Sequence, residues 1–156
     1  MQFKVMFVCL GNICRSPLAK ALFEKHEYEN GLQNRFYIDS AGTNRNHAGE
    51  GADRRTLLNA RKNGLVFYHE AKQFKLSHFE TFDLIVVMDR SNENNVKSLS
   101  ADMELHKKVH LMRKWDIHGT NEDVPDPWYG GPEGFEEVFQ ILNRSTAALL
   151  RDLAFG

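Results

Sequence analysis

Short apolar runs recur along the chain, and the segments between them carry apolar residues at helical spacing. The runs over residues 3–8, 35–42 and 82–89 predict β-strands, and the run over residues 107–112 is a fourth candidate strand. The third run, "FDLIVVMD", is apolar at all its central positions, so this strand should be covered on both faces.

Helices are predicted in the segments that follow these strands, over residues 17–30, 53–64, 90–99 and 134–153. Pro17 suits a first helical turn because its missing N–H would have no partner there. Asp53 and Ser91 are the predicted N-caps of the second and third helices, and Gly64 is expected just past the second. The last helix carries an apolar stripe, formed by Phe135, Val138, Phe139, Leu142, Leu149 and Leu153.

The alternation of strands and helices predicts an α/β fold, with a parallel sheet and helices on both faces. Sheets of this kind bind their ligands at the carboxyl ends of the strands. Residues 9–16 follow the first strand and residues 88–92 follow the third, so functional groups are expected in these two segments. No repeat or linker interrupts the pattern, which predicts a single domain over residues 1–156.

Composition narrows the possible partners. The 156 residues are 42% hydrophobic and 26% charged with a net charge of -1, values typical of a soluble globular domain. This balance gives no reason to expect nucleic acid or an anionic membrane as a partner. Two cysteines are too few for a disulfide scaffold, and the apolar start is too short for a signal peptide or a membrane span. We therefore expect a reducing, cytoplasmic compartment.

The stretch "VCLGNICRSP", residues 8–17, joins the first strand to the first helix. Gly11 permits unusual backbone angles, and Asn12 tolerates the left-handed region, so the loop can turn several N–H groups toward one point. Arg15 adds a planar fork of donors that matches two oxygens of a tetrahedral oxyanion. The loop therefore predicts a phosphate site. It is no Walker-type loop, because it has no GK[ST].

Cys9 lies at the base of this predicted cradle. The N–H donors and Arg15 favour a thiolate, which is placed for in-line attack on a bound phosphorus atom. Ser16 can donate a hydrogen bond to the sulfur and ease its departure. A buried strand-end cysteine beside a surface arginine is the ordinary alternative, and the spacing of Cys9, Arg15 and Ser16 argues against it. Cys14 is either loop packing or a resolving thiol for Cys9.

A proton donor for the leaving oxygen is expected in the acidic loop "NEDVPDPWYGGPEG", residues 121–134. Asp126 is the best candidate, because Pro125 and Pro127 restrict its backbone. Trp128 and Tyr129 could form walls for a flat ring. From this loop alone, an ordinary turn or capping aspartate remains the open alternative.

The two stretches together resemble the paired signatures of the low-molecular-weight protein tyrosine phosphatase family, and the resemblance covers essentially the whole chain. The segments "DSAGT", "HEAKQ" and "DLIVVMDRSN", residues 39–43, 69–73 and 83–92, are also similar to family segments. The resemblance implies a three-layer sandwich with a four-stranded parallel sheet. It implies a metal-free, cofactor-free enzyme that acts on phosphotyrosine in proteins and is inhibited by phosphate and other oxyanions.

The resemblance also implies the roles of individual residues. Cys9 is the expected nucleophile, Arg15 the phosphate and transition-state ligand, and Asp126 the general acid and then base. Asn12, Ser16, Ser40 and His69 are the expected hydrogen-bond network that holds the loop. Substrate binding is expected from Leu10, Gly11, Asn12, Ile13, Cys14, Ser16, Trp128 and Tyr129.

The chain departs from the family pattern near the expected substrate cleft. Asn46, before His47, stands where many members have an aromatic residue, so one wall of the cleft is expected to be missing. Glu70 and Lys72 replace common arginines and predict a less basic surface.

Related activities on the same fold are the alternatives. Protein arginine phosphatases resemble "CTGNTCRSP" in this loop, whereas the apolar Ile13 favours a phenyl ring. Thioredoxin-coupled arsenate reductases use two further downstream cysteines, and this chain has none after Cys14. A module that only binds phosphorylated ligands would need no acid, so Asp126 argues against it.

Overall fold

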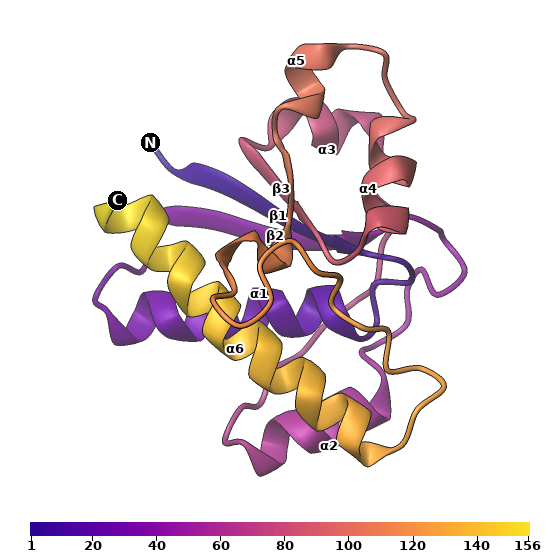
Figure 1. Cartoon of the computed structure of the whole chain (residues 1–156), viewed down its shortest axis with the longest axis vertical. Helices are drawn as coiled ribbons and strands as arrows, with labels where there is room; N and C mark the ends of the chain where they lie inside the picture. The colour runs from indigo at the N-terminus through magenta and orange to yellow at the C-terminus, as the bar shows by residue number, and fades with distance from the viewer.

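A four-stranded parallel sheet forms the centre of the molecule, in a computed structural model that describes all residues from 1 to 156. The strand order is β2-β1-β3-β4, with β1 at Phe3–Cys9, β2 at Phe36–Gly42, β3 at Leu84–Val87 and β4 at Val109–Leu111 (Figure 1). This sheet, with helices on both faces, confirms the predicted α/β sandwich and the fourth strand.

Six α-helices surround the sheet. Their bounds are α1 Arg15–Glu29, α2 Arg54–Lys62, α3 Leu76–Thr81, α4 Arg90–Lys97, α5 Met103–His106 and α6 Pro132–Phe155. A 3₁₀ turn, η1, spans Met112–Trp115. The sequence pattern missed α3, α5 and η1, because elements of four to six residues are too short to show a helical period. None of the helices is both long and apolar enough to cross a bilayer.

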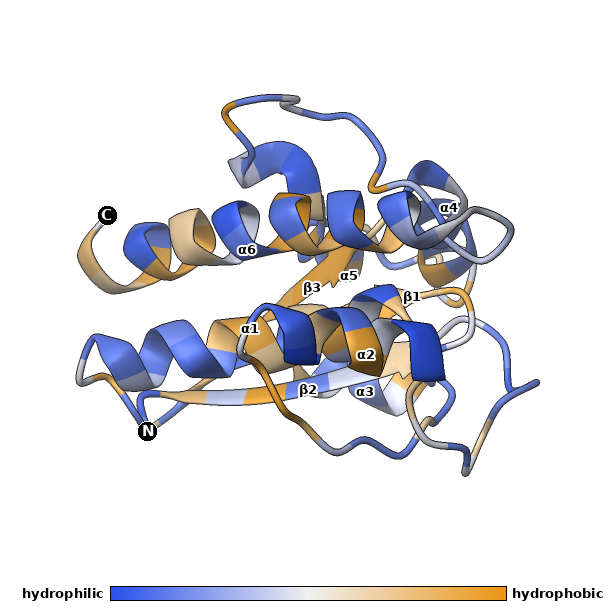
Figure 2. Cartoon of the chain, turned by 90° about the horizontal axis from the view of Figure 1, so that it is seen from below, coloured by the Kyte–Doolittle hydropathy of each residue, from blue (hydrophilic) through white to orange (hydrophobic).

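Successive residues of β1 point to opposite faces of the sheet and thereby create two cores. Val5 and Phe7 belong to the larger core, with the apolar sides of α1 and α6. Met6 and Val8 belong to the smaller core, with α3 and α4. Figure 2 shows β3 in hydrophobic colours and hydrophilic turns on the outer side of α6.

Helix caps show where the sequence prediction held and where it failed. Asp53 caps α2 as predicted, since its carboxylate accepts the N–H of Arg55 at 2.8 Å, and Gly64 follows α2 with φ of +82°. Ser91 was the wrong cap for α4. Asp89 caps this helix instead, and its Oδ1 accepts the N–H of Asn92 at 2.7 Å, because the helix already begins at Arg90.

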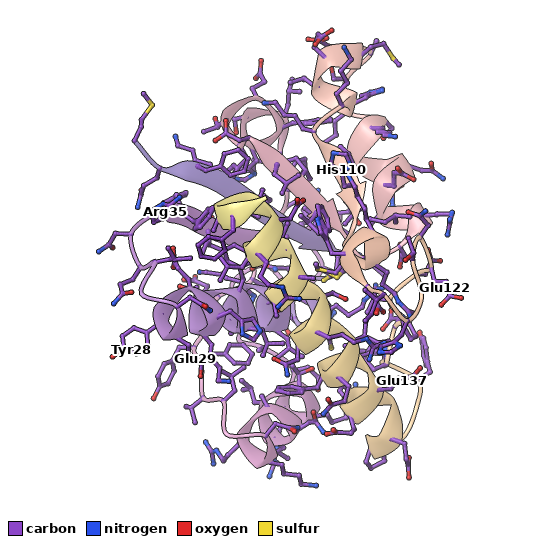
Figure 3. All side chains as sticks on the ribbon, turned by 60° about the vertical axis from the view of Figure 1, so that its left-hand side comes forward. Tyr28, Glu29, Arg35, His110, Glu122 and Glu137 are labelled. Atoms are coloured by element: carbon purple, nitrogen blue, oxygen red, sulfur yellow. The ribbon has the colours of Figure 1, made fainter.

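The carboxyl ends of the strands meet the N-terminus of α1 at one edge of the sheet. α1 runs away from this edge, and Figure 3 shows Tyr28 and Glu29, at its far end, on the opposite side of the molecule from Glu122. Glu122 lies in the segment that leads from η1 to α6. The edge therefore gathers the two segments to which the sequence assigns chemistry.

Candidate active site

The loop between β1 and α1 is shaped by one left-handed residue. Asn12 has φ of +58°, whereas Gly11, the residue expected to supply unusual angles, has no positive φ. Gly42, at the end of β2, is the glycine that the loop requires. A Cβ there would lie 2.8 Å from the Leu10 carbonyl oxygen and 2.9 Å from the Gly11 carbonyl carbon. The loop backbone can reach its position only because residue 42 has no side chain.

Asn12 is the centre of a buried hydrogen-bond network. Its Nδ2 donates to the hydroxyl oxygens of Ser16 at 2.8 Å and Ser40 at 3.0 Å, and its Oδ1 accepts the N–H of Lys72 at 3.0 Å. The Nε2–H of His69 donates to the Asn12 carbonyl oxygen over 2.6 Å. Burial lowers the pKa of His69, so the imidazole is neutral at pH 7. The structure thus brings together the four residues expected to hold the loop.

Cys9 lies at the bottom of the loop with 3% of its surface exposed, and its Sγ is 2.9 Å from Ser16 Oγ. The Ser16 hydroxyl is therefore within hydrogen-bonding distance of the sulfur and can stabilise a negative charge on it. Ser16 and Asn12 themselves are completely buried. Their side chains support the loop from behind and are not among the residues that line the cavity, so the expected part of these two residues in substrate binding stays a prediction.

Arg15 is a buried guanidinium held by two oxygens. Its Nη1 donates to Asp89 Oδ2 at 2.8 Å and to the Val124 carbonyl oxygen at 2.9 Å. Burial opposes the charge, but the nearby Cys9 sulfur, Asp89 and Asp126 outweigh burial and raise the pKa of Arg15. Asp89, which sequence reasoning left without a role, thereby both caps α4 and orients Arg15. Its position at the end of the third strand, where functional groups were expected, could have identified it.

Asp126 faces this arginine from the acidic loop. Its Oδ2 lies 3.8 Å from Arg15 Nη2, and its Oδ1 accepts the N–H of Trp128 at 3.0 Å. The carboxylate side chain is 42% exposed, in contrast to the buried arginine. Asp126 is thus open to solvent yet directed toward the same point as Cys9 and Arg15.

A cavity of about 220 Å³ joins these groups. Cys9, Arg15 and Asp126 all line it, and the other lining residues are Leu10, Gly11, Ile13, Cys14, Asn44, Asn46, His47, Trp128 and Tyr129. The structure contains no cluster of three or more His, Cys, Asp or Glu side chains that could hold a metal ion.

His47 lines the cavity where the aromatic residue expected at position 46 is missing. Its ring centroid lies 5.8 Å from that of Trp128, and its Nδ1 is 3.0 Å from Glu50 Oε1. The expected gap is therefore lined by an imidazole and two asparagines. Lys72, which replaces a common arginine, is paired with Asp39.

Ile13 and Cys14 pack against Ala71 and Phe135 in a small apolar cluster. Burial raises the pKa of Cys14 to about 12, although a hydrogen bond with Thr56 opposes the shift. Cys14 is therefore a neutral thiol at pH 7. Both cysteines are free in this structure.

The fold and this site define a class of protein: an α/β sandwich with an oxyanion cradle between its first strand and first helix. The family model for low molecular weight phosphotyrosine protein phosphatase matches residues 4–155, and the chain belongs to that family. It is accordingly a protein-tyrosine-phosphatase.

Relatives across distant organisms share nearly the full length of the chain. A "Low molecular weight protein-tyrosine-phosphatase" of Streptomyces coelicolor is 41% identical over 96% of this chain and 93% of its own length. A "Low molecular weight phosphotyrosine protein phosphatase" of Saccharomyces cerevisiae is 43% identical over 96% and 94%. The crystal structure of a protein tyrosine phosphatase from Entamoeba histolytica, with Hepes in its active site, superposes with a TM-score of 0.93. It is 34% identical and covers 97% of each chain.

Proposed function

We propose that the whole chain, residues 1–156, acts as one catalytic domain that hydrolyses phosphotyrosine in proteins through a phosphocysteine intermediate on Cys9. The observation that carries the proposal is the convergence of Cys9, Arg15 and Asp126 on one cavity. A nucleophile, an oxyanion ligand and a proton donor are the three groups that hydrolysis of an aryl phosphate needs without a metal.

The first step transfers the phosphoryl group to the protein. The loop N–H groups and Arg15 bind the phosphate oxygens, and the Cys9 thiolate attacks phosphorus in line with the leaving oxygen. The S–P bond forms as the P–O bond to the ring breaks. Asp126 gives its proton to the departing phenolate oxygen, so a neutral phenol leaves.

The second step returns the enzyme to its starting state. Asp126, now a carboxylate, takes a proton from a water molecule whose oxygen attacks phosphorus. The S–P bond breaks and inorganic phosphate forms, which leaves the pair of electrons on Cys9 Sγ. Ser16 Oγ, 2.9 Å away, stabilises this thiolate as it leaves.

The walls of the cavity support an aromatic substrate. Ile13 contributes an apolar side chain beside the loop, while Trp128 and Tyr129 stand at the exposed rim. Such walls bury the faces of a phenyl ring and give a flexible alkyl guanidine fewer contacts. This supports phosphotyrosine over phosphoarginine, with phosphate and other oxyanions as competitive inhibitors. The two free thiols support a reducing compartment, in line with the expected cytoplasmic location.

A panel of phosphotyrosine, phosphoserine and phosphoarginine peptides tests the substrate, with each assay run with and without EDTA. We expect phosphotyrosine to be cleaved fastest and EDTA to have no effect. Faster cleavage of phosphoarginine would reassign the substrate, and loss of activity in EDTA would contradict the metal-free mechanism.

Rapid acid quench of the enzyme with a ³²P-labelled aryl phosphate tests the intermediate. The label should remain on the protein in wild type and in Cys14→Ala, and be absent in Cys9→Ser. Cys14→Ala is the matched control, because Cys14 is the other cysteine of the same loop. Loss of the label in Cys14→Ala and not in Cys9→Ser would identify Cys14 as the nucleophile.

A further inference from the structure

Arg55, the second residue of α2, reaches from its helix to the loop that carries Asp126. Its Nη1 donates to the Trp128 carbonyl oxygen at 2.8 Å, across 73 positions of sequence. The contact joins a helix that provides no catalytic group to the loop that carries the proposed proton donor. Nothing in the mechanism above gives this arginine a role.

The guanidinium of Arg55 is fixed on its other edges. Its Nε and Nη2 donate to the two carboxylate oxygens of Asp53 at 3.1 and 3.0 Å, and Asp53 is itself the cap of α2. The Cζ atom lies 5.0 Å from the ring centroid of Trp128 and 4.8 Å from that of Phe135. Arg55 is thus held by a bidentate pair and lies within cation–π distance of two aromatic rings.

Trp128 connects Arg55 to the carboxylate of Asp126. Its carbonyl oxygen accepts from Arg55, and its N–H donates to Asp126 Oδ1 at 3.0 Å. The other oxygen of Asp126 then faces Arg15, 3.8 Å away. A displacement of the Trp128 backbone, which makes both contacts on either side of its Cα atom, would therefore turn the carboxyl group away from the cavity.

This part of the loop is only partly packed, although the N–H of Gly130 donates to the Pro127 carbonyl oxygen at 3.0 Å. Tyr129 is 95% exposed, and a second cavity, of about 200 Å³, lies beside Gly130 and Gly131. Arg55 and Phe135 also line that cavity. Because open space borders the loop, packing alone does not fix it, and the hydrogen bond from Arg55 adds a direct restraint on Trp128.

We propose that Arg55 is the positioning residue for the general acid: by holding the Trp128 carbonyl it keeps the Asp126 carboxyl within reach of the leaving oxygen. This inference rests on the proposed role of Asp126. Proton transfer needs a heavy-atom distance close to that of a hydrogen bond, so a shift of about 1 Å is enough to slow the step strongly.

The test compares Arg55→Gln with Arg54→Gln over a series of aryl phosphates whose phenols span a wide range of pKa. Arg54 is the matched control, because it is the neighbouring arginine, is exposed, and has no hydrogen-bond or ion-pair partner. We expect Arg55→Gln to lower kcat about tenfold or more for the poorest leaving group and by less than about twofold for the best. Arg54→Gln should match wild type across the series.

The same variants in an Asp126→Asn background separate positioning from general loss of structure. If Arg55 acts through Asp126, Arg55→Gln should have almost no further effect once the carboxyl group is gone. A loss that is equal for all leaving groups, or that persists in the Asp126→Asn background, would overturn the inference. If Asp126→Asn by itself shows no dependence on the leaving group, the proposed function fails first and independently of Arg55.

A second variant keeps the test valid if Arg55→Gln folds poorly. Arg55→Lys retains the charge without the planar fork of donors, and it should give a smaller loss than Arg55→Gln with the same dependence on the leaving group. Wild-type behaviour of Arg55→Lys would contradict the need for the fork.

Discussion

The two loops that meet at the cavity are built in opposite ways. Residues 9–16 are buried except at Leu10 and Gly11, and Asn12 ties this loop to β2 and to the segment around residues 69–72. Residues 125–131 are mostly exposed, and Asp126 depends on the N–H of Trp128 for its orientation. A closed cradle and an open proton donor therefore share one site.

The difference follows from what each loop has to do. Donors that stabilise an oxyanion contribute most when they are fixed in advance in a water-poor environment, because no reorganisation is needed during reaction. A proton donor must instead leave a path for the ring and its attached peptide. The buried loop supplies charge stabilisation, and the exposed loop supplies access.

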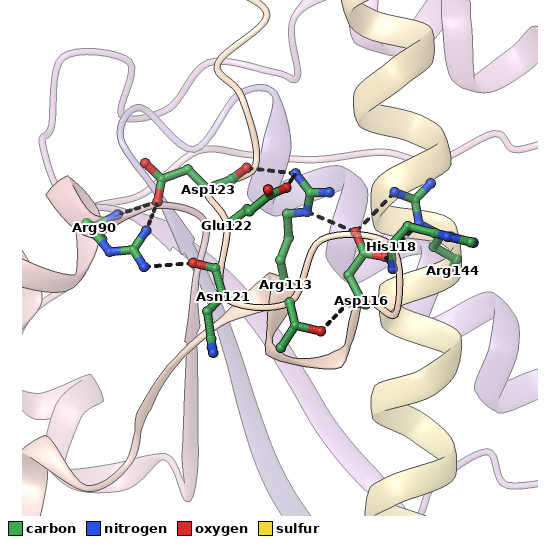
Figure 4. Close-up of polar contacts among 9 residues, drawn as sticks. Arg90, Arg113, Asp116, His118, Asn121, Glu122, Asp123 and Arg144 are labelled. Atoms are coloured by element: carbon green, nitrogen blue, oxygen red, sulfur yellow. Dashed lines mark hydrogen bonds and ion pairs between the residues drawn. The ribbon is translucent and has the colours of Figure 1, made fainter.

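The two loops also differ in the kind of interaction that supports them. The network around Asn12 in the first loop consists of neutral groups, to which Arg15 adds an ion pair with Asp89, whereas several charged side chains hold the base of the second loop (Figure 4). There Asp116, fully buried, accepts from Arg113 Nε at 2.9 Å and from Arg144 Nε at 2.8 Å. Arg113 Nη1 in turn donates to the Asp123 carbonyl oxygen at 3.2 Å. Strong acid, which protonates carboxylates, should therefore weaken the base of the second loop.

The largest effect is expected from Cys9→Ser, which removes the nucleophile and leaves the cradle in place. Turnover should fall by roughly 10⁴-fold or more, because a serine hydroxyl at neutral pH is not ionised as the attack requires. Phosphate binding, measured by calorimetry, should survive. Hydrolysis near the wild-type rate would end the covalent mechanism.

Asp126→Asn should remove the proton donor of the open loop and leave the oxyanion cradle intact. We expect about a 10²- to 10³-fold loss of kcat for aryl phosphates with poor leaving groups and a much smaller loss for good ones. The measurement is a plot of log kcat against phenol pKa. A loss independent of that pKa would exclude Asp126 as the acid and make Asp123 and Glu122 the next candidates.

Asn12→Ala should damage the closed loop. It places an alanine at φ of +58° and leaves Ser16, Ser40 and the N–H of Lys72 without their partner, which should cost about 3 kcal/mol of unfolding free energy. Urea denaturation measures this loss.

Asn34→Ala controls for backbone strain, since Asn34 is exposed, has φ of +72°, and its side chain makes no hydrogen bond. Equal losses in Asn12→Ala and Asn34→Ala would show that the network around Asn12 contributes nothing beyond strain.

Acid should release the support beneath the open loop. Burial opposes the Asp116 charge, but the hydrogen bonds from Arg144, His118 and Arg113 lower its pKa from 3.8 to about 2. A lowered folded-state pKa means that the stabilisation is complete above pH 3.8 and is lost as the pH falls toward 2. It corresponds to about 2 kcal/mol.

Comparison of wild type with Asp116→Asn by denaturant unfolding measures this contribution. The difference in unfolding free energy between the two proteins should narrow as the pH falls from 4 to 2. A difference that stays constant over this range would mean that Asp116 does not titrate as its ion pairs predict.

The smallest effect concerns substrate preference in the closed loop. Ile13→Thr should shift the ratio of phosphotyrosine to phosphoarginine cleavage toward phosphoarginine by about tenfold, because one apolar contact with the ring is lost. The ratio of kcat/KM values for the two peptides measures this shift. An unchanged ratio would show that Trp128 and Tyr129 decide the preference.

Local sequence was sufficient for the strands, the longer helices and the catalytic groups of the closed loop. Apolar periodicity gave the strands and the long helices, since the period of a helix or strand is a property of neighbouring residues. Cys9, Arg15 and Ser16 lie within eight positions of each other, so their spacing already predicts a shared site. Asp126 was identifiable for a similar reason, because the two flanking prolines mark it in the sequence.

Only the tertiary structure could assign the long-range partners. Asp89 meets Arg15 across 74 positions, His69 meets the Asn12 carbonyl across 57, and Arg55 meets Trp128 across 73. These contacts depend on the order of the strands and on the packing of the connections between them. Neither can be read from the spacing of neighbouring apolar residues. The same reason explains why Asn12 and not Gly11 is left-handed, and why the glycine that the cradle needs is Gly42, a residue of the neighbouring strand.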